Sequence, residues 1–91
     1  MAVDIKLSTR EDQLIARHIE PDAHKPERAE ARVVGSGVHV WALIPHLQAE
    51  NGDLEAAAAH YDLTTEQVEA AAAYYHRHQS AIDARIEANA L

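Results

Sequence analysis

Alanine makes up 19 of the 43 apolar residues in this 91-residue chain, and this limits the core that the chain can build. The chain is one domain by length, and a domain of this size buries only about 60–65% of its unfolded surface. We therefore expect marginal stability for the isolated chain and a tendency to self-associate or to bind a partner. Small residues at Ala57 and Ala58 predict helices that approach each other closely.

Composition excludes several classes of protein. The chain has no cysteine, so disulfides, thiolate zinc sites and a cysteine nucleophile are excluded. No apolar run approaches the roughly 18 residues that span a membrane. The segment Met1–Leu14 carries both charge signs and lacks the apolar stretch of a signal peptide. We predict a soluble, cytoplasmic protein.

Charge is distributed unevenly along the chain. The net formal charge is −7, of which −1 lies before Ser36 and −6 lies from Ser36 onward. No lysine or arginine occurs between Arg32 and Arg77. An acidic chain is a poor binder of nucleic-acid backbones, because that affinity comes largely from Lys and Arg.

The N-terminal third predicts one short helix and a polar connector. Ser8 and Glu11 form a capping-box pattern ahead of apolar residues at helical spacing, which predicts a helix over Thr9–Arg17. Pro21 ends that helix. The two-proline segment Pro21–Glu30 is expected to be irregular. Together, residues 1–31 form an N-terminal arm and connector.

The segment Arg32–Trp41 carries β-branched residues on both sides of Gly35-Ser36-Gly37. This pattern predicts a small β-hairpin or two short extended pieces, with a helix from Val40 onward as an equal alternative. Apolar residues at helical spacing then predict a helix over Trp41–Glu50. Because Pro45 lies inside it, this helix either starts near Ala42 or bends at the proline.

The following segment has helix-turn-helix spacing. Asp53 caps a predicted helix over Leu54–His60, and Asn51-Gly52 closes the preceding helix. Thr64 or Thr65 caps a last helix that runs from Glu66 to about Asn89, since no Gly or Pro interrupts it. The pattern fits a helix-turn-helix and a plain helical hairpin equally well. Residues 32–78 form the predicted core, and residues 79–91 extend the last helix.

A DNA-binding role for this motif has mixed support. A recognition helix presents Arg, Lys, Asn or Gln to base edges. The positions expected to point outward here include two carboxylates; the set is Thr65, Glu66, Gln67, Glu69 and Ala70. Phosphate contacts would then come from other parts of the chain. The predicted DNA-binding residues are Lys25, Arg28, Arg32, Thr65, Gln67 and Arg77.

Metal and catalytic sites have little support in the sequence. His76 and His78 lie two residues apart on a helix, so they point about 200° away from each other and cannot share a metal. The Gly35-Ser36-Gly37 segment lacks the Lys-Ser/Thr end of a phosphate loop, and Ser36 has no local base. We predict a non-enzymatic protein without metal or cofactor.

Four segments together resemble the small bacterial family catalogued as domain of unknown function 433. The first, Arg32–Ile44, is similar to the family's glycine-containing core that ends in Val-Trp-x-Leu. The segments Asn51–Leu54 and Ala58–Leu63 are similar to its continuation, and Thr65–Tyr75 is similar to its alanine- and tyrosine-rich helix. The resemblance covers about Ile19–Ile86, which is most of the chain.

The resemblance implies a homeodomain-like three-helix fold and a VapB-type antitoxin. The implied partners are a PIN-like nuclease toxin and operator DNA for autoregulation. The chain departs from the family at Lys25–Arg28, where the usual glycine-rich entry is missing, and in its extension Arg77–Leu91.

The C-terminal apolar stripe has three interpretations: it binds the toxin, closes a homodimer, or completes the chain's own core. The predicted interface residues are Trp41, Tyr74, Tyr75, Ile82, Ile86 and Leu91. We therefore predict a mainly α protein that acts as an antitoxin-like regulator, and that is a homodimer. The alternatives are a DNA-binding regulator without a toxin and a structural or homodimeric interaction module.

Overall fold

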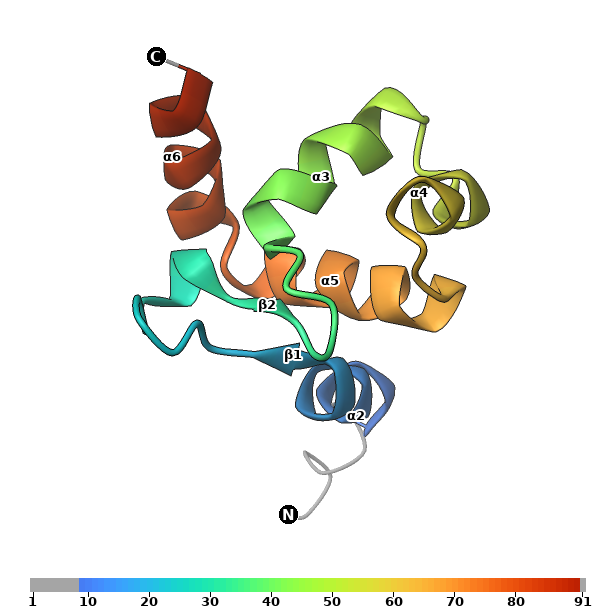
Figure 1. The fold of residues 1–91 in the computed structure, drawn as a ribbon, viewed down its shortest axis with the longest axis horizontal. Helices are drawn as coiled ribbons and strands as arrows, with labels where there is room; N and C mark the ends of the chain where they lie inside the picture. Colours follow the sequence, from blue (N-terminus) through green and yellow to red (C-terminus); the bar gives the residue numbers. More distant parts are fainter. Residues whose placement is uncertain (1–8, 91) are drawn as a thin grey trace, which may run out of the picture.

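The computed structural model describes residues 9–90 and is mainly helical, with a small antiparallel hairpin (Figure 1). The helices are α2 (Thr9–His18), α3 (Val40–Ala49), α4 (Leu54–Tyr61), α5 (Thr65–Arg77) and α6 (Gln79–Ala90). A 3-10 turn, η1 (Arg28–Glu30), and the strands β1 (Ile19–Glu20) and β2 (Arg32–Val33) lie between α2 and α3. The predicted roles of Ser8 and Leu91 fall outside the described residues.

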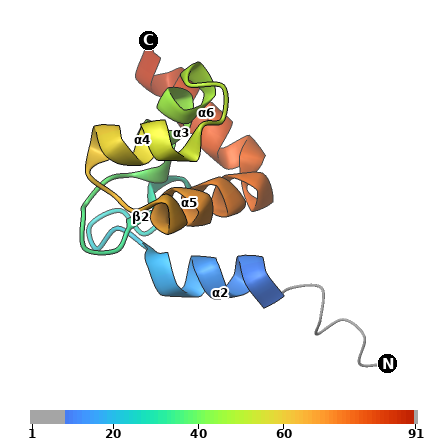
Figure 2. The ribbon, with the colours of Figure 1, turned by 90° about the vertical axis from the view of Figure 1, so that its right-hand side faces the viewer.

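Helix α5 is the central element. It lies between α2 on one side and α3 and α4 on the other (Figure 2). Val68 and Ala71 of α5 are fully buried in the main core cluster, together with Leu43 of α3 and Ala57 of α4. The small side chains keep these helices close, as their positions predicted.

The predicted helix starts agree with the caps in the structure. The Asp53 carboxylate accepts from the backbone N–H groups of Glu55 at 3.0 Å and Ala56 at 3.2 Å. At α5, the Thr64 hydroxyl accepts from the Gln67 N–H at 3.1 Å, and the Gln67 side chain accepts from the Thr64 N–H at 2.8 Å. This is a complete capping box, and it satisfies amides that have no partner within the helix.

Strand β2 has an antiparallel neighbour on each side, one expected and one not. Strand β2 pairs with β1 of the N-terminal third, with Ile19 opposite Val33 and Glu20 opposite Arg32. Beyond the glycine turn, the chain returns beside β2 on its other side. Arg32 and His39 form an antiparallel bridge, the Val33 N–H donates to the Val38 carbonyl at 2.8 Å, and the Val40 N–H donates to the Ala31 carbonyl at 2.9 Å. The expected hairpin within Arg32–Trp41 is therefore present in a short form, whereas the pairing of β2 with β1 was not expected. Helix α3 starts at Val40 and buries that residue, which leaves too few residues for a second strand.

Proline does not delay the start of α3. The helix begins at Val40 and includes Pro45 in its interior, so the alternative of a start near Ala42 is wrong. Four of its side chains are buried, which favours helix formation despite the hydrogen bond that proline removes. The buried residues are Val40, Leu43, Ile44 and Leu47.

The expectation of one long C-terminal helix is also wrong. The helix ends at Arg77, and His78 adopts φ −130° and ψ 37° before α6 begins. The break directs α6 toward α3 and η1, and it places Ile82 fully inside the core. Since no Gly or Pro marks this position, burial of Ile82 is the physical reason for the change in direction.

Replacing Ile82 with alanine should test how far α6 belongs to the core. We expect Ile82→Ala to lower the free energy of unfolding by about 2–5 kcal/mol, because it leaves a cavity at a fully buried site. Urea denaturation measures the change. Ile86→Ala is the matched control on the same helix, and its loss should be smaller because Ile86 is only partly buried. Equal losses for the two variants would contradict this assignment of the core.

Candidate functional site

The face of α5 that was expected to point outward is covered by α2. Arg10 binds Glu69 with two nitrogens, at 2.9 and 3.2 Å. Glu66 accepts from Arg17 at 3.1 Å and contacts the His18 ring nitrogen at 2.8 Å. The hydrogen bond with His18 is the largest of the effects that hold the pKa of Glu66 below its ordinary value. Both carboxylates of the α5 start are thus bound within the chain.

The burial of alanine side chains on α5 also shows that α2 covers this face of the helix. Ala70 and Ala73 share the α5 face of Glu66 and Glu69 and are buried, as is Leu14 of α2. The prediction that Ala70 points outward is therefore wrong. The reason is tertiary: α2 packs on a face that helical spacing alone leaves open.

Two residues of α5, Thr65 and Gln67, were predicted to contact DNA bases, and both lie in the first turn of the helix. The Gln67 side chain belongs to the capping box with Thr64. Thr65 is exposed in the first turn of the helix. Glu66 and Glu69 bind α2 side chains, so fewer polar side chains of α5 are free to contact another molecule.

Two of the predicted phosphate-binding cations are ion-paired within the chain. Arg32 pairs with Glu20 at 3.0 Å. Arg77 pairs with Asp12, and with Glu11 at 3.3 Å. Such pairs reduce the positive charge available to an external phosphate.

Lys25 and Arg28 differ from these two arginines. Both are exposed, and neither forms an ion pair with a carboxylate in the part of the chain that the structure describes. Of the six residues predicted to bind DNA, the structure brings Arg28 and Arg77 to one cavity, between η1 and the junction of α5 with α6.

The predicted interface residues mostly complete the chain's own core. Ile82 is fully buried, and Trp41, Tyr74, Tyr75 and Ile86 pack partly buried against the same cluster. The Arg85 guanidinium lies 4.1 Å from the centre of the Trp41 ring, and its Nε donates to Glu30 at 2.6 Å.

The hydroxyl groups of Tyr74 and Tyr75 also form hydrogen bonds within the chain. The Tyr74 hydroxyl donates to the Arg28 carbonyl oxygen, and the Tyr75 hydroxyl donates to Asp83, each at 2.8 Å. Burial raises the pKa of Tyr74, and the Asp83 hydrogen bond is the first cause of the raised pKa of Tyr75. Of the three interpretations of the C-terminal stripe, these contacts agree with closure of the chain's own core.

An acidic surface surrounds α4. It consists of Glu50, Asp53, Glu55 and Asp62, all exposed, and we call it the α4 acidic surface. The Asp53 carboxylate accepts two backbone N–H groups, and Glu50 lies 3.6 Å from His46. Because no Lys or Arg occurs between Arg32 and Arg77, the helices α3 and α4 carry no cationic side chain apart from histidine. Residue-by-residue reasoning missed this surface, although the charge asymmetry of the sequence points to it.

A carboxylate–imidazole pair fixes the connector. His39 Nε2 lies 3.0 Å from Asp22 Oδ2, and Asp22 Oδ1 accepts from the backbone N–H groups of His24 and Lys25 at 2.8 and 3.2 Å. These bonds lower the pKa of Asp22 to about 2, with the His39 bond the largest cause. The nearby Ser36 hydroxyl donates to the Val33 carbonyl at 3.0 Å, so it is bound within the glycine turn.

Residues 9–90 lack two kinds of feature. No group of three or more His, Asp or Glu side chains is arranged to hold a metal ion. None of the helices in the same range combines the length and the apolar character that crossing a membrane needs.

Comparison with known proteins returns no relative of this chain: no family model, no curated protein and no solved structure matches it. The resemblance to domain of unknown function 433 therefore stays a prediction.

Loss of the His39 side chain should change the acid response of the fold. In His39→Ala we expect the pKa of Asp22 to rise from about 2 toward 3.8, because the largest cause of the lowering is removed. A lowered carboxyl pKa stabilises the fold above pH 3.8, and this stabilisation is lost as the pH falls toward about 2. The variant should therefore be less stable than the parent at pH 7, and the part of the difference that comes from Asp22 should be lost as the pH falls through about 2.

Urea denaturation at both pH values and carboxyl NMR titration measure these effects. His24→Ala is the matched control, since His24 contacts Asp22 through its backbone N–H only. An unchanged Asp22 titration in His39→Ala would show that the imidazole does not hold the carboxylate.

Proposed function

We propose that the chain is a non-enzymatic, antitoxin-like regulatory protein that binds a basic protein partner, a PIN-like nuclease toxin. The observation that carries the proposal is the α4 acidic surface. It presents exposed carboxylates on a part of the chain that has no lysine or arginine. The family resemblance supplies the identity of the partner.

Charge explains why such a surface suits a nuclease. A protein that binds RNA presents cations to the phosphate backbone, and an acidic protein surface can occupy the same face. Charge complementarity speeds the encounter of the two proteins and disfavours partners of the wrong sign. With a net charge of −7, the whole chain contributes to this steering.

Finer features of the fold and assembly belong to the same proposal. We infer that α3, α4 and α5 correspond to the homeodomain-like helix-turn-helix core of the family, and that the chain is a homodimer. The order of the three helices and the tight α4–α5 turn support the first inference. In that turn, Asp62 adopts φ 59° and the Leu63 N–H donates to the Ala58 carbonyl at 2.8 Å.

The alternative of a DNA-binding regulator has weaker support. Its recognition helix would be α5, whose outward face is covered by α2 through the bonds to Glu66 and Glu69. The purely structural or homodimeric module remains as the third hypothesis. It predicts neither toxin nor DNA binding.

A tagged chain purified from its native host tests the three hypotheses together, with bound protein and bound DNA both identified. The antitoxin proposal predicts a stoichiometric basic nuclease whose RNA cleavage is inhibited in the complex. Glu55→Lys should weaken that complex and slow its formation, since it reverses one of the charges of the α4 acidic surface. Association kinetics at two salt concentrations measure the effect.

Glu27→Lys is the matched control, because it makes the same charge change on the connector, away from α4. If both variants weaken the complex equally, the effect comes from the net charge of the chain. That result would contradict a role for the α4 acidic surface. Recovery of DNA alone, with affinity lost in Arg28→Ala and Arg32→Ala, would support the DNA-binding regulator instead. Recovery of the chain alone as a dimer would support the structural module.

A further inference from the structure

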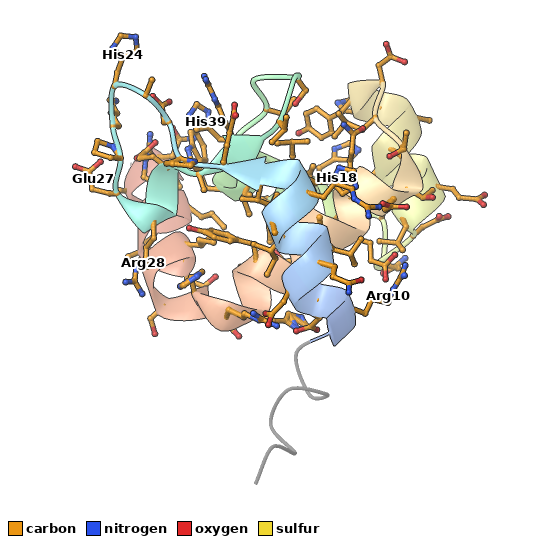
Figure 3. The ribbon with its side chains drawn as sticks, turned by 90° about the horizontal axis from the view of Figure 1, so that it is seen from below. Arg10, His18, His24, Glu27, Arg28 and His39 are labelled. Carbon is orange, nitrogen blue, oxygen red and sulfur yellow. The ribbon has the colours of Figure 1, made fainter. Side chains whose placement is uncertain are left out.

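Arg28 differs from every other arginine between residues 9 and 90. The other five each form an ion pair with a carboxylate; they are Arg10, Arg17, Arg32, Arg77 and Arg85. Arg28 has no such pair. It lies on η1 at the edge of the molecule, away from Arg10 and His18 on α2 (Figure 3). Among the Lys and Arg residues between 9 and 90, only Lys25 shares this lack of an ion pair, in a chain of net charge −7.

The surroundings of Arg28 fix it against the α5–α6 junction. The Tyr74 hydroxyl donates to the Arg28 carbonyl oxygen at 2.8 Å, and the Tyr74 and His78 rings lie 4.5 Å apart. The Arg28 guanidinium lies 3.3 Å from Nδ1 of His78. A permanent cation thus contacts an imidazole instead of an anion.

His78 is neutral at pH 7 for a physical reason. Partial burial lowers its pKa below the ordinary 6.5, and the positive charges of Arg28 and Arg77 lower it further. Its Nδ1 can therefore accept from the Arg28 guanidinium. The titratable groups around it are Arg28 on η1, Tyr74, His76 and Arg77 on α5, and Glu11 and Asp12 of α2 beyond Arg77.

These groups surround an open cavity of about 400 Å³. Its lining includes Arg28, His76, Arg77, His78, Gln79 and Ser80, and no carboxylate residue. Two guanidinium groups, two imidazoles and two neutral hydrogen-bonding side chains therefore meet at one place. The guanidinium of Arg77 is held by Glu11 and Asp12, so Arg28 supplies the uncompensated charge.

We propose that this cavity binds the phosphate group of inorganic phosphate or of a small phosphate monoester. A guanidinium matches the geometry of phosphate oxygens and forms strong charge-assisted hydrogen bonds with them. A bound dianion also offsets the repulsion of Arg28 and Arg77. His78 then takes up a proton at Nδ1, its hydrogen bond from Arg28 is given up, and both groups donate to the phosphate. The site is independent of the α4 acidic surface and of the proposed antitoxin role.

The monoester fits better than a nucleic-acid backbone. A phosphodiester carries one charge, and a strand gains affinity from several cations placed along it. Here the other arginines of the described range are paired, so only the exposed Lys25 joins Arg28 as a cation without a carboxylate partner. A phosphate monoester carries more charge than a phosphodiester on one compact group, and this suits the single cluster of Arg28, Arg77 and His78.

An NMR titration with inorganic phosphate at constant ionic strength tests the proposal on the full chain. We expect saturable shifts of the His76 and His78 ring signals and a rise in the pKa of His78 on binding. Arg28→Gln should weaken phosphate binding about tenfold or more, the loss expected when a hydrogen bond from a charged group is removed. Once the second ionisation of phosphate itself is allowed for, with a pKa of about 6 for a monoester, His78→Gln should bind phosphate with less dependence on pH between 5 and 7.

Arg10→Gln is the matched control, because it removes the same charge from an exposed arginine on α2. Phosphate shifts that do not saturate, or equal weakening in Arg28→Gln and Arg10→Gln, would overturn the proposal. Phosphoserine and a short single-stranded oligonucleotide serve as further probes. Phosphoserine should compete with inorganic phosphate, whereas tighter binding of the oligonucleotide at the same residues would overturn the monoester in favour of nucleic acid.

Discussion

The fold depends on close contact between the two sides of α5 and its neighbours. Ala71 and Val68 face α3 and α4, while Ala70 and Ala73 face α2, and all four side chains are buried. Larger residues at these positions would push the flanking helices apart, and overpacking of this kind costs roughly 1–3 kcal/mol. The alanines thus set the spacing on which both the core and the α2 ion pairs depend.

Closure of α5 by α2 also determines which surfaces remain for partners. The bonds of Arg10 and Arg17 to Glu69 and Glu66 use charge from α2 to neutralise charge on α5. Exposed pairs of this kind add little stability individually, so their main effect is to fix the register of the two helices. What remains available is the acidic surface at α4 and the cationic cluster at Arg28, on separate elements of the fold.

Sequence reasoning worked where local chemistry decides the structure and failed where distant packing does. The caps at Asp53 and Thr64 and the α2 helix follow from residues within one turn of each other, and they were predicted. The pairing of β2 with β1, the break at His78 and the burial of Ala70 depend on segments far apart in the sequence. The Asp22–His39 pair and the Arg28–His78 contact were missed for the same reason, since 17 and 50 residues separate the partners.

The joint at His78 has a consequence for how two copies of the chain can combine. A single non-helical residue separates α5 from α6, and Ile82 reaches the core only because the chain turns there. If the joint became helical, α6 would continue along the α5 axis and leave its place beside α3. A second copy, straightened in the same way, would offer its own α6 to that vacant place. With both joints straight, reciprocal exchange of the C-terminal helix would keep the same core contacts between two chains.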